Sequence, residues 1–144
     1  MQATMKRTDR RSDCPINHAL QILGDSWSLL VMRDLMFVGK RTFAEFMESE
    51  ERISTNVLTS RLRTLAGEGL IRRDGSGRAT RYSLTLKGLD LLPTMVALIV
   101  WSARYDPQTA APGEFVARAA NDRDGLVAEL RRQLAAAHGI AEAH

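Results

Sequence analysis

The chain has 144 residues, of which 44% are hydrophobic, so it is long enough to bury a core and is expected to form one domain. Its single cysteine excludes a framework of internal disulfides. The formal net charge is only +3, which excludes a general polycation. Residues 52–87, however, carry eight Lys and Arg against two Asp and Glu. Such a concentration predicts a polyanionic partner, with a merely solvated arginine-rich face as the plainer alternative.

No segment indicates export or membrane insertion. The N-terminus is polar and charged, without the apolar core of a signal peptide. The most apolar segment, 89–101, is too short to span a bilayer and contains Pro93. We therefore expect a soluble, cytoplasmic protein with no membrane partner.

The chain begins with a polar segment and two predicted helices. Residues 1–13 are rich in Lys and Arg, which is typical of a mobile basic arm. Pro15 suits the first turn of a helix, because its missing amide hydrogen is not needed there, and Gly24 would interrupt that helix. Asp25 or Ser26 can then cap a second helix.

Two further helices are expected between Gly39 and Gly67. Gly39 ends the second helix, and Thr42 can cap a short third one. Ser54 can cap a longer helix, because its hydroxyl can accept from an unpaired amide of the first turn. That helix carries a narrow apolar stripe made of Leu58, Leu62 and Leu65. Rotation of about 100° per residue places a polar face opposite the stripe, made of Asn56, Thr59, Ser60 and Arg63.

A basic hairpin is predicted directly after this helix. Residues 70–73 favour a strand, residues 74–77 supply the glycines of a tight turn, and residues 78–84 return as the second strand. A polar-faced helix followed by an arginine-rich hairpin is typical of a winged helix-turn-helix, in which helix and wing fit the two grooves of DNA. The expected fold is thus mainly α with a small β-hairpin wing.

The C-terminal part is expected to hold additional helices. Residues 86–104 form a helix with apolar side chains on more than one face, including Trp101, and such a helix is either a monomer's core or shared between subunits. Because the preceding domain is small, we favour a dimerisation helix, together with the N-terminal helix from Pro15. Residues 105–120 are expected to be a linker, and 121–139 an accessory helix capped by Asn121.

An ordered set of motifs resembles the HxlR-type transcriptional regulators. The motifs are Cys14-Pro15, LGDSWSLLVMRDL at 23–35, GKRTFAEF at 39–46, ISTNVLTSRLRTL at 53–65, Gly69-Leu70, YSLTLKG at 82–88 and Leu92-Pro93. The resemblance covers residues 14–104, with a short wing at 75–77, and the tail beyond Tyr105 lies outside it. It implies a dimeric bacterial winged-helix regulator that binds double-stranded DNA. Two copies related by a twofold axis would read an inverted repeat.

Candidate DNA contacts follow from side-chain chemistry. Asn56 suits bidentate contact with adenine, and Arg63 suits guanine or a phosphate. Arg78 and Arg81 can follow the backbone or enter a narrow minor groove. The full set is Lys40, Arg41, Ser54, Thr55, Asn56, Thr59, Ser60, Arg63, Arg78 and Arg81. Plainer roles stay open, since Thr55 and Asn56 can support the helix cap and Arg61 can form an internal ion pair.

Cys14 is the one candidate for redox chemistry. It precedes Pro15 at a predicted helix start, where the helix dipole favours a thiolate. Some members of the resembled family sense oxidants or electrophiles through a cysteine at this position. The alternative is a small residue that fills space in a dimer interface. A small-molecule effector is a further option.

Two other classes of function compete with this interpretation. An enzyme is disfavoured, because the three histidines are scattered, no residues have metal-ligand spacing and no glycine-rich phosphate loop occurs. We therefore expect no catalytic residues, no metal and no cofactor. The second class is a winged helix that serves only protein–protein association. The basic wing residues disfavour it, because such a module has no general need of them.

Overall fold

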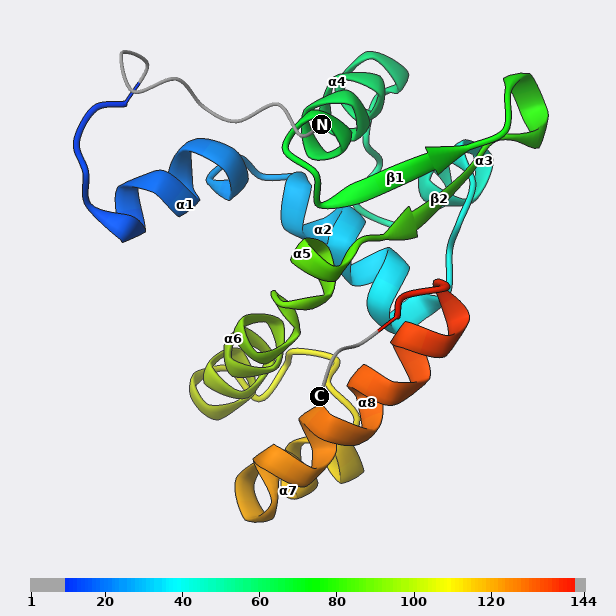
Figure 1. The fold of residues 1–144 in the computed structure, drawn as a ribbon. Coiled ribbons are helices and arrows are strands. Elements are labelled where there is room, and N and C mark those ends of the chain that lie inside the picture. Colours follow the sequence, from blue (N-terminus) through cyan, green and yellow to red (C-terminus); the bar gives the residue numbers. More distant parts are fainter. Residues whose placement is uncertain (1–9, 142–144) are drawn as a thin grey trace. The chain divides into compact units, whose positions relative to one another are not determined.

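The computed structural model describes residues 10–141 and divides the chain into two compact units, 1–88 and 89–144 (Figure 1). Most of the predicted basic arm, 1–13, lies outside the described residues. The boundary falls inside residues 14–104, the range that the family resemblance covers. The reason lies in the last three helices, which pack on one another and so form a second cluster.

The first unit contains helices and one antiparallel hairpin, which confirms the predicted class, mainly α with a small β-hairpin. Its elements are α1 (Pro15–Leu23), α2 (Ser28–Arg33), the π-helix η2 (Asp34–Val38), α3 (Phe43–Met47), α4 (Thr55–Gly67), β1 (Ile71–Asp74), the 3₁₀ turn η3 (Gly77–Ala79) and β2 (Arg81–Leu84). The short helix α5 (Leu86–Leu89) ends at the boundary between the units.

Asp25 organises the start of α2. Its carboxylate accepts hydrogen bonds from the amides of Trp27 and Ser28, both at 2.8 Å, and from the Ser28 hydroxyl at 2.6 Å. The N-cap position itself is Trp27, so neither predicted residue occupies it, but Asp25 accepts from the first amides of the helix. Burial opposes ionisation of this carboxyl, but the hydrogen bonds from Ser28 and Trp27 outweigh it and lower the pKa of Asp25.

The second predicted helix changes geometry in its last turns. Residues 34–38 form a π-helix, which ends at Gly39 with φ of 82°. A wider turn of this kind is rare and has no sequence signal comparable to an apolar periodicity. Gly39 ends the helix as predicted, because glycine adopts a left-handed conformation without steric cost.

The core of the first unit lies beneath α4 and one face of the hairpin. Leu58, Leu62 and Leu65 are 0%, 3% and 0% exposed, which confirms the predicted stripe. They share the interior with Met32, Leu35, Phe46, Ile71 and Leu84. α4 contacts α2, α3 and β1, so its buried stripe is held by three elements.

The second unit consists of α6 (Leu92–Tyr105), α7 (Gly113–Asn121) and α8 (Arg123–Ala137). The predicted helix 86–104 is interrupted at residues 90–91, because Pro93 has no amide hydrogen to continue it and instead opens α6. α7 occupies part of the segment expected as a linker. Asp122, and not Asn121, caps α8 by accepting from the Gly125 amide at 3.1 Å.

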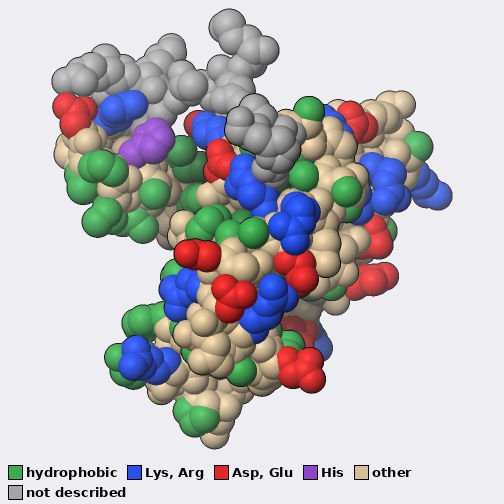
Figure 2. Space-filling model, turned by 60° about the horizontal axis from the view of Figure 1, so that its bottom comes forward, with side chains coloured by type: hydrophobic (Ala, Val, Ile, Leu, Met, Phe, Trp, Pro, Cys, Tyr) green, Lys and Arg blue, Asp and Glu red, His purple; other side chains and the backbone are tan. Residues whose placement is uncertain are grey.

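Several apolar side chains of α1 and α6 are exposed. On α1, Ile16 and Leu20 are 72% and 54% exposed, and Figure 2 shows hydrophobic side chains gathered over this helix. On α6, Trp101 and Tyr105 are 64% and 70% exposed, with ring centroids 5.9 Å apart. Trp101 is therefore not a core residue within the chain.

The helical segment Leu86–Tyr105 has 20 residues and is long and apolar enough to cross a membrane. Segment 89–101 alone is too short to span a bilayer, but the helical segment around it is longer and meets the length requirement. Length and composition cannot distinguish a membrane span from a helix that packs in a water-soluble protein. In this chain α6 packs on α7 and α8.

Candidate nucleic-acid interface

α4 begins at a well-formed cap and presents a polar surface. The Ser54 hydroxyl accepts from the Val57 amide at 3.2 Å, as predicted. Opposite the buried stripe, the exposed side chains are Thr55, Asn56, Thr59, Ser60 and Arg63. Since the leucines fix the rotation of the helix, this polar face cannot turn inward without exposing the core.

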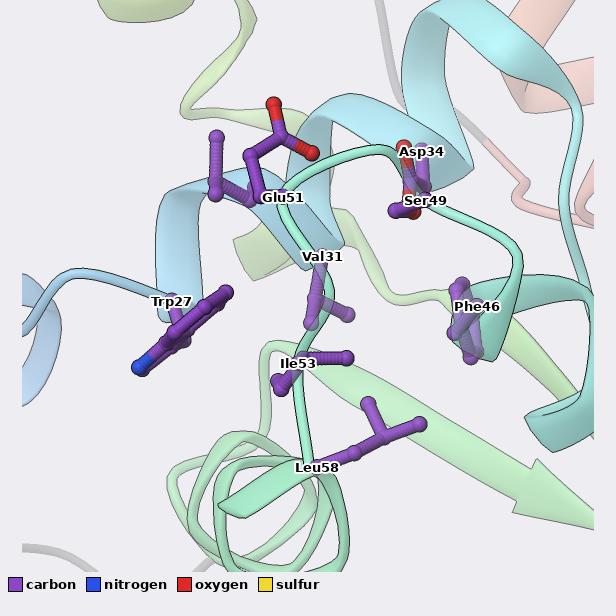
Figure 3. A pocket seen from close by; sticks show the side chains of 9 residues that line it. Trp27, Val31, Asp34, Phe46, Ser49, Glu51, Ile53 and Leu58 are labelled. Atoms are coloured by element: carbon purple, nitrogen blue, oxygen red, sulfur yellow. The ribbon is translucent and has the colours of Figure 1, made fainter. Parts of the chain in front are cut away.

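The loop before α4 is pinned to α2 and η2. Arg33 donates two hydrogen bonds to the Glu51 carboxylate, at 2.5 and 3.0 Å. The Ser49 hydroxyl donates to the buried Asp34 carboxylate at 2.7 Å, and Figure 3 shows these two side chains side by side. Lys40 donates in turn to the Ser49 hydroxyl at 3.0 Å. The Lys40 ammonium, a predicted DNA contact, is thus engaged inside the protein.

A small cavity lies among the side chains that this loop brings over α2. Val31, Ile53 and Leu58 line it together with Trp27 and Phe46 (Figure 3). Its accessible space is about 10 Å³, which is room for at most one water molecule. The cavity is therefore a gap in packing and cannot hold an effector.

The register of the hairpin separates its arginines onto two faces. Ile71 pairs with Leu84 and Arg73 with Tyr82, so these four residues share the face that contains the buried Ile71 and Leu84. Arg72 pairs with Ser83, and Asp74 with Arg81, on the opposite face. The neighbouring residues Arg72 and Arg73 therefore lie on opposite faces of the hairpin.

The second strand of the hairpin is joined to Arg41. The Arg41 guanidinium donates to the Tyr82 carbonyl at 2.6 Å and to the Ser83 hydroxyl at 2.5 Å. Burial lowers the pKa of Arg41, and so do the nearby positive charges of Arg81 and Arg72. Arg41, a predicted DNA contact, thus holds strand β2 of the hairpin within a cationic cluster.

An open groove of about 880 Å³ lies between α3, α4 and the hairpin. We call it the α3–α4–hairpin groove. It is lined by Thr42, Phe43, Ala44, Thr59, Leu62, Arg63, Ala66, Arg73, Gly77, Arg78, Thr80 and Tyr82. Lys and Arg side chains gather at the hairpin tip, at the right edge of Figure 2.

The groove unites some of the predicted residues and separates others. Thr59, Arg63 and Arg78 line it together, whereas Arg81 lies on the other face of the hairpin. Arg61 forms an ion pair with Asp25 at 3.3 Å, in accord with the alternative that the sequence left open. Arg73 was missed as a candidate, although strand alternation from the apolar Ile71 would have placed it on the inner face.

Cys14 is exposed and immediately precedes α1. Its amide donates to the Ser12 hydroxyl at 3.3 Å. The nearby Arg10 pairs with Asp13 at 3.9 Å, so this cation is shared with a carboxylate. No other cysteine occurs in the chain, so a disulfide of Cys14 requires a second molecule.

Comparison with known proteins identifies the family to which this chain is similar. A model of the HxlR-like helix-turn-helix matches residues 22–110. The HTH-type transcriptional regulator sll1512 of Synechocystis sp. is 38% identical over 88 residues, which are 59% of this chain and 64% of the relative. YdeP of Bacillus subtilis, also an HTH-type transcriptional regulator, is 31% identical over 101 residues, 68% of this chain and 78% of the relative. The chain spans just under two thirds of the length of the first such relatives.

Solved structures agree with this assignment. The crystal structure of PA1607 is 34% identical, with a TM-score of 0.63 over 73% of this chain and 75% of that one. The reduced redox regulator HypR is 28% identical, with a TM-score of 0.57 over 65% and 95% of the chains. The reduced transcriptional regulator YodB from B. subtilis is 25% identical, with a TM-score of 0.54 over 68% and 100%. The chain belongs to the HxlR-like helix-turn-helix family, a family of transcriptional regulators and not of enzymes, and has the winged fold that its sequence predicted.

Proposed function

We propose that this protein is a sequence-specific DNA-binding regulator that acts as a homodimer on an inverted-repeat operator. The observation that carries the proposal is the exposed polar face of α4 beside a hairpin whose Arg73, Arg78 and Arg81 are exposed. A helix of this kind fits the major groove, and a cationic hairpin fits the flanking backbone or minor groove. Phosphate neutralisation supplies affinity, and side chains that reach base edges supply sequence preference.

The predicted contacts divide by role. Asn56 and Arg63 read base edges, while Thr55, Thr59 and Ser60 approach the groove wall closely. Ser54 and the first amides of α4 meet a phosphate, and Arg78 and Arg81 follow the backbone. Lys40 and Arg41 form internal hydrogen bonds, and in addition they contribute positive electrostatic potential near the DNA backbone.

The dimer is proposed to form through the exposed apolar side chains of α1 and α6, which include Ile16, Leu20, Leu98, Trp101 and Tyr105. Large exposed apolar patches favour association, because association removes them from water. A twofold arrangement places two copies of α4 on half-sites whose centres are about 34–36 Å apart, or a multiple of that. As a water-soluble regulator of transcription, the dimer would act in the cytoplasm.

A redox signal is part of the proposal, since HypR is a redox regulator of similar structure. Two Cys14 thiols from the two subunits would lose two protons and two electrons to an oxidant such as hydrogen peroxide and form an intersubunit disulfide. Cys14→Ser should then abolish the oxidant response of DNA binding and leave binding by the reduced protein intact. An unchanged response in the variant would exclude this signal.

Selection from a pool of random duplex DNA, followed by a salt titration, tests the main proposal. We expect enrichment of an inverted repeat, affinity that falls steeply with salt, and loss of enrichment in Asn56→Ala and Arg63→Ala. Arg132→Ala, an exposed site on α8, is the control for loss of one positive charge. Weak binding without sequence preference by both wild type and variants would favour the protein-interaction alternative.

A further inference from the structure

The charge of the α3–α4–hairpin groove is one-sided. Arg63, Arg73 and Arg78 line it, and no Asp or Glu is among its lining residues. All three arginines are exposed, and none of their guanidinium groups forms a hydrogen bond or ion pair with another residue in the described range 10–141. Like charges held together without counter-charges make a concave surface that favours an anion.

The floor of the groove is apolar. Leu62 and Tyr82 are 3% and 8% exposed, and Phe43, Ala44 and Ala66 complete this surface. The volume of about 880 Å³ falls in the usual range of small-molecule sites, about 300–1,000 Å³. An apolar floor with a few polar groups at its edge suits a ligand with a hydrophobic body and one charged group.

Thr80 adds an unsatisfied hydroxyl to the groove wall. The residue is 7% exposed, and its Oγ1 is buried without a hydrogen-bond partner among the described residues. Buried hydroxyls in folded proteins almost always have a partner. Because this oxygen is buried, a bound molecule reaches it only if the side chains around it move aside.

The groove overlaps the proposed DNA surface only in part. Its α4 residues are Leu62 of the buried stripe, Thr59 and Arg63 of the polar face, and Ala66, so the groove lies along one edge of that polar face. Thr59, Arg63 and Arg78 belong to both surfaces, whereas Asn56 does not line the groove. A molecule bound in the groove would therefore contact Arg63 and leave part of the polar face of α4, including Asn56, uncovered.

We propose that the α3–α4–hairpin groove is an effector site for a small aromatic carboxylate. The ring lies on the apolar floor and the carboxylate between the arginines. Occupation withholds Arg63 and Arg78 from DNA, so the ligand releases the operator. The release step rests on the proposed function, whereas binding of the ligand does not.

Direct binding to the full chain is the first test, by calorimetry with 2-naphthoate and its uncharged analogue 2-naphthamide. We expect one naphthoate per chain and at least about tenfold weaker binding of the amide, since hydrogen bonds to a charged group are the stronger kind. Arg73→Ala should weaken binding of naphthoate by about tenfold. Arg72→Ala is the matched control, because it removes the same charge from the opposite face of the hairpin and should leave binding nearly unchanged.

Three outcomes of the binding experiment would overturn the proposal. The first is no binding of naphthoate to the wild-type protein when circular dichroism shows that it is folded. The second is equal weakening by Arg72→Ala and Arg73→Ala, which would indicate a diffuse charge effect. The third is unchanged binding in Phe43→Ala, because the ring would then not lie on the proposed floor.

Competition with the selected operator duplex tests the release step. Naphthoate should displace DNA from the wild type but not from Arg73→Ala, at ionic strength matched with sodium chloride. Binding of naphthoate without displacement would overturn the coupling. If naphthoate does not bind while Arg73→Ala lowers the salt dependence of DNA binding, the groove holds DNA phosphates instead. Failure of the proposed function would give a different result. The protein would then show no specific DNA binding, although it would still bind naphthoate.

Discussion

Arg52 holds a strained backbone conformation in the turn that leads into α4. Its φ of 59° is the only positive value at a non-glycine residue in the described part of the chain. The Cβ of such a residue crowds the following carbonyl, at a cost of about 1–2 kcal/mol. The turn is nevertheless held, because Arg33 and Asp34 bind Glu51 and Ser49 immediately before it.

Arg52→Gly should remove that strain. Because glycine also has more freedom in the unfolded chain, we expect stability to be equal or up to about 1 kcal/mol higher in urea denaturation. Arg52→Val is the matched control and should be less stable than wild type, since a β-branched residue tolerates positive φ poorly. A glycine variant less stable than the valine variant would contradict the described turn.

Glu51 links stability to pH. Its hydrogen bonds from Arg33 lower the pKa of Glu51, although burial opposes them. A folded pKa below the unfolded value means that the group stabilises the fold above the unfolded pKa, and that this contribution is lost as pH falls through the folded pKa. We expect the free energy of unfolding to fall from about pH 5 to about pH 3, and to fall less in Glu51→Gln. Glu50→Gln is the control, and an equal pH dependence in Glu51→Gln and wild type would exclude this role.

At the scale of elements, Gly88 permits the close approach of α5 to the residue before β1. A Cβ at position 88 would lie 2.0 Å from the Leu70 carbonyl oxygen, which belongs to the backbone and cannot move aside easily. Gly88→Ala should therefore lower the unfolding free energy by about 2–3 kcal/mol in urea denaturation. Gly67→Ala at the end of α4 is the control, because a Cβ there meets nothing within 4 Å. It should be neutral or stabilising, and equal losses in both variants would contradict the close approach.

The elements that sequence predicted well are those with strong local signals. Ser54 and the three leucines determine the start and the rotation of α4. The hairpin was predicted correctly as a unit, but its connection runs over residues 75–80 and not 74–77, since Asp74 pairs with Arg81. The second strand begins at Arg81 and not at residue 78, because Gly77–Ala79 form a 3₁₀ turn. α7 lies in the segment expected as a linker. Proline and glycine, which stand at 112 and 113, are typical of linkers, but here they form the N-cap and the first residue of a helix.

The candidate site was predictable as a region but less so residue by residue. Which cations are internally engaged depends on contacts between distant residues, such as Arg41 with Ser83 and Lys40 with Ser49. No local pattern encodes these pairs. Arg73 could have been placed from strand alternation, because only its register relative to Ile71 was needed.

At the scale of the whole molecule, the exposed aromatic pair on α6 allows a test of the proposed dimer. Trp101→Glu should convert the protein to monomers at micromolar concentration, because an unpaired charge would be buried in the interface. DNA affinity should fall with it, since two half-sites are no longer bound together. Light scattering after size exclusion measures the mass. Ala120→Glu, an exposed site on α7, is the control, and a wild type that is itself monomeric would contradict the interface.

The separation of the hairpin arginines onto two faces has a consequence for changes in chain length. Extra residues between Gly75 and Ala79 would lengthen the tip while leaving the paired strands unaltered. One extra residue inside β1 would instead exchange the faces of every residue beyond it, turning Arg73 out of the groove. Natural variation in length should therefore be tolerated at the tip and selected against within the strands.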